Sequence, residues 1–172
     1  MKAPGAPSVF WPRLSRSPAI PVKVVCGPPA SGKSRYVREN AGPGDVVIDL
    51  NAILREIGGP PRGGGWDARR RALEERNRRL QALADERRAS AAWFITTAAT
   101  GAARERWARM LRAGRALLLL TPFEICQERI LSDPERHAES EIQLAVLARW
   151  WRMYYPSRLD LLLANEVKRG KK

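Results

Sequence analysis

The sequence predicts an α/β fold in which helices cover both faces of a parallel β-sheet. From residue 22 onward, short apolar or β-branched runs alternate with segments of helical periodicity. The first run, Val22–Cys26, leads through a loop rich in glycine and proline into a helical segment. The longest apolar run, Ala116–Leu120, suits a buried strand and is far shorter than the ~20 residues of a membrane span. A chain of 172 residues with this pattern fits one main domain.

We expect four strands, each followed by one or two of six helices, which leaves few right-handed topologies. The strands are expected at 22–26, 45–50, 91–97 and 116–121, and the helices at 33–40, 52–57, 66–89, 102–112, 123–131 and 139–155. The helix at 66–89 is long, rich in arginine and has only a narrow apolar stripe. It is interpreted either as a solvated, salt-bridged helix docked by that stripe or as a lid over an anionic substrate.

Composition divides the chain into an extended, basic, proline-rich arm at 1–21, a core domain at 22–164 and a basic tail at 165–172. Phe10 and Trp11 could hold the arm against the body or a partner. The arm has no long apolar segment of the kind that signal peptides contain, so we expect a cytoplasmic protein (in the host cytoplasm, if phage-encoded) without a membrane anchor. Cys26 and Cys126 lie among apolar neighbours and are expected to be buried free thiols. The net charge of +13 favours polyanionic partners, among them nucleotides and nucleic acid.

The loop after the first strand fits the phosphate-binding pattern G-x-x-x-x-G-K-[ST] in full. Its residues are Gly27, Pro28, Pro29, Ala30, Ser31, Gly32, Lys33 and Ser34, and Arg35 follows them. Glycines let backbone N–H groups turn toward phosphate oxygens, and the following helix adds its positive N-terminal end. In this pattern the lysine, Lys33, reaches the β- and γ-phosphates, and the hydroxyl of Ser34 is offered to Mg²⁺. The sequence therefore predicts that this stretch, including Arg35, binds ATP or another nucleoside triphosphate with Mg²⁺.

An acid lies near the C-terminal end of the second expected strand, where ligands of open α/β sheets bind. Asp49 could orient or deprotonate an acceptor hydroxyl, or help to hold Mg²⁺ through water. Alternatively, Asp49 or Asn51 caps the helix that follows. The third expected strand ends in Thr96 and Thr97 without an acid, which argues against an ATP-driven motor with an ordinary carboxylate at that strand.

Two arginines flank the break after the helix at 123–131. Arg129 and Arg136 could form a lid that stabilises a transferring phosphoryl group, or could be surface residues paired with Glu128 or Glu135. An aromatic cluster follows on the helix at 139–155, and we expect it to pack against the sheet rather than to stack on bases. Its residues are Trp150, Trp151, Tyr154 and Tyr155.

These motifs resemble the P-loop kinases of the polynucleotide-kinase type, which include phage 5′-kinases and small phage ATP-binding P-loop proteins. The likeness covers roughly residues 22–155 and rests on GPPASGKS, VVIDLNAILREI, TAATGAARERWARML and LLLLTPFEICQERILSDPER. It implies a three-layer fold with sheet order 2-3-1-4, Asp49 as the acceptor-activating acid, and Arg129 and Arg136 as lid arginines. The sequence departs from the family at Thr96, where the family has an acid that organises the acceptor, and at 58–89, where a glycine-rich loop and a long arginine-rich helix replace a shorter connection.

Two functions of different classes follow. The first is an ATP-dependent kinase that moves the γ-phosphate to a hydroxyl of a nucleic-acid end or a nucleoside-like acceptor, with Lys33, Asp49, Arg129 and Arg136 as catalytic residues. The second is a nucleotide-dependent accessory protein that binds nucleic acid and hydrolyses ATP weakly or not at all. In the second, the basic arm, the helix at 66–89 and the tail would hold the nucleic acid.

Overall fold

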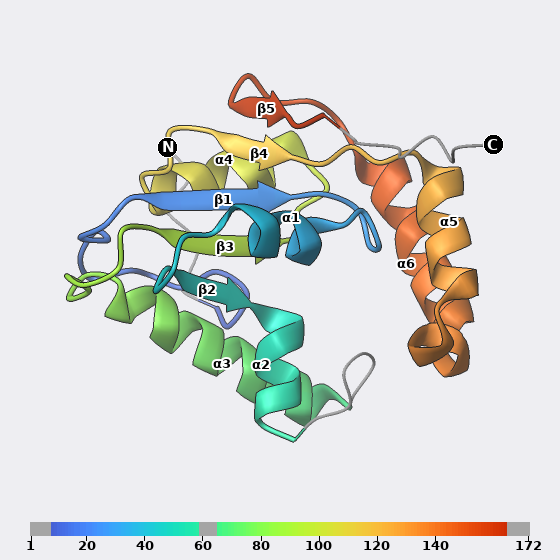
Figure 1. The fold of residues 1–172 in the computed structure, drawn as a ribbon, viewed down its shortest axis with the longest axis horizontal. Coiled ribbons are helices and arrows are strands. Elements are labelled where there is room, and N and C mark those ends of the chain that lie inside the picture. The colour runs from blue at the N-terminus through green and yellow to red at the C-terminus, as the bar shows by residue number, and fades with distance from the viewer. Residues whose placement is uncertain (1–7, 59–64, 165–172) are drawn as a thin grey trace.

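The computed structural model describes residues 8–58 and 65–164, which form a parallel five-stranded sheet with helices on both faces (Figure 1). The strand order is β2-β3-β1-β4-β5, and each neighbouring pair is parallel. The predicted order 2-3-1-4 is therefore confirmed, with one further strand beside β4. The predicted tail at 165–172 and the first seven residues of the predicted arm lie outside the described residues.

The elements alternate along the chain as the hydrophobic pattern predicts. They are β1 (Val22–Cys26), α1 (Lys33–Asn40), β2 (Val46–Asp49), α2 (Leu50–Glu56), α3 (Trp66–Ala82), β3 (Ala92–Thr96), α4 (Gly101–Met110), β4 (Ala116–Leu118), α5 (Phe123–Ser132), the 3₁₀ helix η1 (Pro134–Glu139), α6 (Ser140–Met153) and β5 (Asp160–Leu162). The strand arrows point toward the side of the molecule where α5 and α6 stand (Figure 1). The loops at that edge include the predicted phosphate loop.

The central strand β1 is buried on both faces from Val24 to Cys26, and only Lys23 near its start is exposed. On one face, Val24 joins a core with residues of α3 and α4, including Leu80 and Trp107. On the other face, Val25 packs with Val37 of α1. Burial on both sides makes β1 a rigid support for the loop that begins at its end.

Residues 8–21, here called the strap, pack along α3 and α4. Trp11 lies with its ring centroid 4.7 Å from that of Trp107, and Arg16 forms a bidentate ion pair with Asp85. Arg76 of α3 is buried and donates to the carbonyls of Val9 and Phe10 at 3.0 Å each. Trp11 thus holds the strap to the body as expected, whereas the ring of Phe10 is exposed and lies 5.8 Å from that of the exposed Trp66.

Helix α3 ends at Ala82, seven residues before the predicted end at residue 89. The chain turns at Leu83, which is buried and accepts a hydrogen bond at 2.9 Å from the backbone N–H of Ala19 in the strap. The carboxylate of Glu86 then accepts from the backbone N–H groups of Arg88 and Ala89. Contacts with a distant segment therefore end this helix, and no glycine or proline marks the position.

A buried ion pair joins β5 to the rest of the fold. Arg104 of α4 is fully buried and binds Asp160 at 2.7 and 2.8 Å. The same guanidinium donates to the carbonyls of Ala98, Ala99 and Tyr155. Arg104 thus ties together the loop after β3, the end of α6 and the edge strand, and its role is structural.

No helix within residues 8–58 and 65–164 combines the length and the apolar character that a bilayer crossing would need.

Candidate nucleotide-binding site

The predicted phosphate loop connects the centre of the sheet to the first helix, with Gly27 and Gly32 at its two ends. A Cβ atom at Gly27 would lie 2.5 Å from the carbonyl oxygen of Leu119, so only glycine allows this close approach. Gly32 has a φ of 98° and is the N-cap of α1, a conformation that also favours glycine. The two glycines of the motif are therefore required by the path of the backbone around the loop.

The Lys33 side chain is folded into the loop. Its Nζ donates hydrogen bonds to the carbonyls of Gly27 at 3.0 Å and Pro28 at 2.7 Å. Burial lowers the pKa of Lys33 to about 8, and the nearby carboxylate of Asp49 opposes part of that shift. The loop thus holds a buried cation whose charge a phosphate chain would stabilise.

The first turn of α1 meets the end of β2 through one hydrogen bond. The hydroxyl of Ser34 donates to Oδ2 of Asp49 at 2.9 Å, and Oδ1 of Asp49 accepts from the backbone N–H of Asn51 at 3.0 Å. Asp49 is therefore the N-cap of α2, as one interpretation expected, and it also contacts the phosphate loop. The Asn51 side chain is exposed, and only its backbone takes part.

The oxygens of Ser34 and Asp49 fit a Mg²⁺ ion that arrives with a nucleotide. They are hard ligands, and Mg²⁺ in nucleotide sites takes one or two protein oxygens together with phosphate oxygens and water. Within the described residues no group of three histidine, cysteine or acidic side chains could hold a metal by itself. This donor set suits a metal bound jointly by protein and phosphate.

The end of β3 lies beside the phosphate loop without contributing an acid. Thr96 pairs in register with Cys26, the last residue of β1. The carbonyl of Thr97 accepts a hydrogen bond at 2.7 Å from Nε1 of Trp150, which is buried and stacks on Tyr154. The expected packing role is therefore confirmed for Trp150, which also links α6 to the end of β3.

The two predicted lid arginines lie in different surroundings. Arg129 is exposed and donates to the carbonyl of Ala30 in the phosphate loop at 3.1 Å. Arg136, in η1, donates to Asp133 at 2.8 Å and to Oε1 of Gln143 at 2.9 Å. Neither contact is the predicted pairing with Glu128 or Glu135. Arg129 touches the loop directly, whereas Arg136 is held within the turn between α5 and α6.

Two further residues, Arg35 and Thr121, complete the description of the loop. Arg35 lies on the exposed side of α1, 2.7 Å from Glu39. Thr121, which the sequence analysis missed, is buried and its hydroxyl donates to the carbonyl of Ser31 at 2.9 Å. Its position directly after β4, at the edge of the sheet where the strands end, is the feature of the sequence that could have identified Thr121. Thr121 therefore fixes the phosphate loop from the strand on the other side of β1.

Both cysteines are buried free thiols, as predicted. Burial raises the pKa of Cys26 to about 12 and that of Cys126 to about 11. Neither thiol is activated for nucleophilic chemistry.

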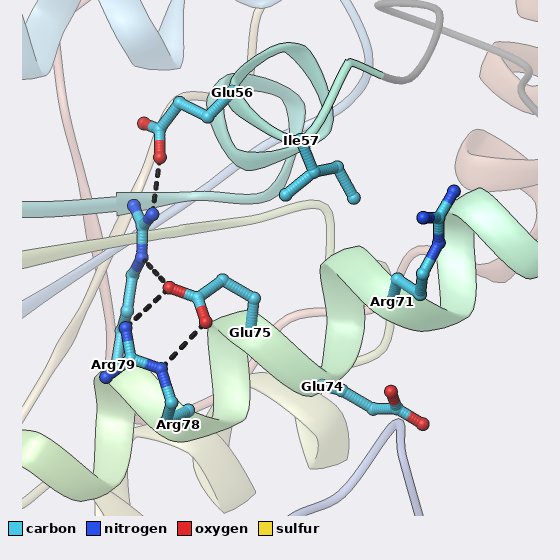
Figure 2. A pocket seen from close by; sticks show the side chains of 7 residues that line it. All are labelled: Glu56, Ile57, Arg71, Glu74, Glu75, Arg78 and Arg79. Atoms are coloured by element: carbon cyan, nitrogen blue, oxygen red, sulfur yellow. Dashed lines mark hydrogen bonds and ion pairs between the residues drawn. The ribbon is translucent and has the colours of Figure 1, made fainter.

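An open groove of about 540 Å³ lies between α2 and α3, away from the phosphate loop residues (Figure 2). Its charged side chains pair with one another, since Arg79 contacts both Glu56 and Glu75, and Arg78 contacts Glu75 (Figure 2). The lining has as many arginines as glutamates, namely Arg71, Arg78 and Arg79 with Glu56, Glu74 and Glu75. These contacts agree with the salt-bridged interpretation of α3.

The strand order and the glycine-lysine-serine loop at the centre of the sheet define a P-loop NTPase-like fold of kinase type. The sequence matches the AAA domain family designated AAA_33 over residues 22–156. The chain belongs to this family, and membership supports a nucleotide-binding, phosphotransferase-type function in general.

Among solved structures, the chain is similar to TT1252 from Thermus thermophilus, with 17% sequence identity and a TM-score of 0.48. The likeness covers 88% of this chain and 91% of that one. No curated protein matches the sequence.

Proposed function

We propose that the protein is an ATP-dependent kinase that transfers the γ-phosphate to a hydroxyl group of a nucleic-acid end or a nucleoside-like acceptor. The observation that carries the proposal is the 2.9 Å hydrogen bond between Ser34 and Asp49. This bond joins the Ser34 hydroxyl, which suits the metal of the donor nucleotide, to the carboxylate of Asp49 at the end of β2. A kinase needs such a carboxylate beside the γ-phosphate in order to prepare the acceptor.

Each remaining group has a role in the same step. Lys33 exchanges its bonds to the loop carbonyls for bonds to phosphate oxygens. The acceptor oxygen attacks the γ-phosphorus, the bond between that phosphorus and the β–γ bridging oxygen breaks, and the hydroxyl proton passes to Asp49. Arg129 and Arg136 stabilise the charge on the transferring group, and ADP leaves. Ser34, with help from Asp49 through water, would hold Mg²⁺, which would neutralise charge at the phosphates.

The accessory-protein alternative is less well supported by the contacts of the basic segments. Arg16 of the strap is paired with Asp85, and the α3 arginines Arg70, Arg78 and Arg79 are paired with glutamates. Arginines that are already engaged with carboxylates bind phosphates less readily. The net charge of +13 remains a reason to include polynucleotides among the acceptors. The free thiols agree with a reducing compartment such as the cytoplasm.

A transfer assay with γ-labelled ATP tests the proposal against 5′-hydroxyl DNA, 5′-hydroxyl RNA and nucleosides. Asp49→Asn should lose at least about 100-fold in transfer rate, the usual scale of general base catalysis, while it still binds Mg-ATP. Lys33→Ala should lose Mg-ATP binding itself. If the wild-type protein binds ATP but labels none of these acceptors, the kinase proposal is wrong.

A further inference from the structure

The side-chain amide of Gln143 in α6 has a hydrogen-bond partner for its oxygen but, among the described residues, none for its nitrogen. Its Oε1 accepts a hydrogen bond from Arg136 at 2.9 Å, so the amide nitrogen must face away from the guanidinium. The residue is only 8% exposed, yet Nε2 has no hydrogen-bond partner among the residues described in the structure. Buried donors are nearly always satisfied, so this one calls for an acceptor that arrives from outside the chain.

The surroundings of Gln143 indicate what that acceptor is. Gln143, Leu147 and Trp150 form the buried stripe of α6, and Trp150 bonds the carbonyl of Thr97 at the end of β3. Leu147, one turn from Gln143, belongs to a buried cluster against which Ala30 of the phosphate loop packs. The unsatisfied amide therefore belongs to a helix face that meets the phosphate loop at the carboxyl end of the sheet, with Arg136 bonded to it.

We propose that Gln143 is a phosphate-binding residue of the α5–α6 lid, in which Nε2 donates to an oxygen of the terminal phosphate of bound ATP. At the same time Oε1 holds Arg136 beside that phosphate, so one amide both binds the ligand and orients a charge. This inference rests on the proposed nucleotide-binding function and adds a residue that the sequence motifs do not contain. The other unsatisfied buried atom in the described ranges, Nε1 of Trp151, belongs to a ring that packs among apolar residues of α5, including Cys126 and Ile130.

Two substitutions separate phosphate binding from a purely structural role. Gln143→Glu keeps an oxygen acceptor for Arg136 but replaces the N–H donor by an anionic oxygen, which repels phosphate. Gln143→Leu removes both functions in an apolar side chain of similar size. Ala145→Glu is the matched control, because it adds the same charge on the exposed side of the same helix.

The measurement is calorimetric titration of each variant with Mg²⁺ and either a non-hydrolysable ATP analogue or ADP. We expect Gln143→Glu and Gln143→Leu to bind the ATP analogue at least about tenfold more weakly, the scale of a lost hydrogen bond to a charged group, and ADP less than about threefold more weakly. Ala145→Glu should bind both nucleotides as the wild type does. Thermal unfolding checks that each variant is folded. If Gln143→Glu does not fold, the binding data for Gln143→Leu decide the outcome.

The outcomes are distinguishable. If the wild type binds neither nucleotide, the proposed function fails and this inference fails with it. If the wild type binds both but Gln143→Glu binds the ATP analogue as tightly as before, only the assignment of Gln143 fails. Equal weakening of the ATP analogue and ADP would likewise overturn the contact with the terminal phosphate.

Discussion

Raising the pH should weaken ATP binding through a single buried group, Lys33. Burial lowers the pKa of this lysine to about 8 in the ligand-free protein. The negative charges of a bound triphosphate favour the ammonium form, so the complex holds the proton well above that pH. The binding of ATP must therefore be coupled to the uptake of a proton at any pH at which Lys33 of the ligand-free protein is neutral.

The size of the effect follows from linkage. With a pKa near 8 in the free protein and a much higher one in the complex, the apparent affinity should fall by about tenfold between pH 7 and pH 9. Proton uptake on binding should be about 0.1 per site at pH 7 and about 0.8 at pH 8.5. The same lysine has a folded-state pKa below its unfolded value of 10.5, so its contribution to the stability of the ligand-free protein increases as pH rises from about 8 toward 10.5.

Calorimetry in two buffers of different ionisation enthalpy measures the uptake directly. Lys33→Arg is the control, because arginine stays charged throughout this range and should show no uptake from this position. A wild-type protein that binds ATP at pH 8.5 without taking up a proton would refute the argument that burial holds this lysine near neutrality.

Three further predictions concern the framework of the site. Arg104→Met should destabilise the fold by about 3–5 kcal/mol in denaturant titrations, since it leaves Asp160 buried without its partner, and a change below about 1 kcal/mol would contradict the structural role. Gly27→Ala should lower Mg-ATP affinity and cost about 1–3 kcal/mol of stability, because the new Cβ would lie 2.5 Å from a backbone oxygen. Cys26 and Cys126 should not react with a thiol reagent at pH 8 until the protein is unfolded, and rapid labelling of the native protein would show that they are accessible thiolates.

Local sequence patterns predicted where the phosphate loop lies, between β1 and α1. The phosphate loop is one contiguous segment, and its glycines, lysine and serine follow from the backbone path that such a loop requires. The alternation of strands and helices predicted a parallel sheet with helices on both faces, and the strand order itself came from the resemblance to the P-loop kinases. The fifth strand was not predicted, since Asp160–Leu162 is short and its pairing depends on a distant helix through Arg104.

Contacts between distant segments account for what the sequence did not predict. Helix α3 stops at Ala82 because the strap bonds to Leu83, a residue far away in the chain from Ala19. Gln143 carried no motif, and it stands out only because the fold buries its amide next to Arg136. Neither feature leaves a periodic or local signal.

The contact between Ser34 and Asp49 is harder to predict than the phosphate loop itself. Strand β3 lies between β1 and β2, so an acid at the end of β2 can meet the helix after β1 only across the end of β3. Asp49 pairs in register with Ile95, and Thr96 is the next residue. The strand beside the phosphate loop thus ends in a hydroxyl side chain, and the carboxylate that contacts the loop comes from one strand further away. A search for an acid on the adjacent strand alone would have concluded that this P-loop has no carboxylate.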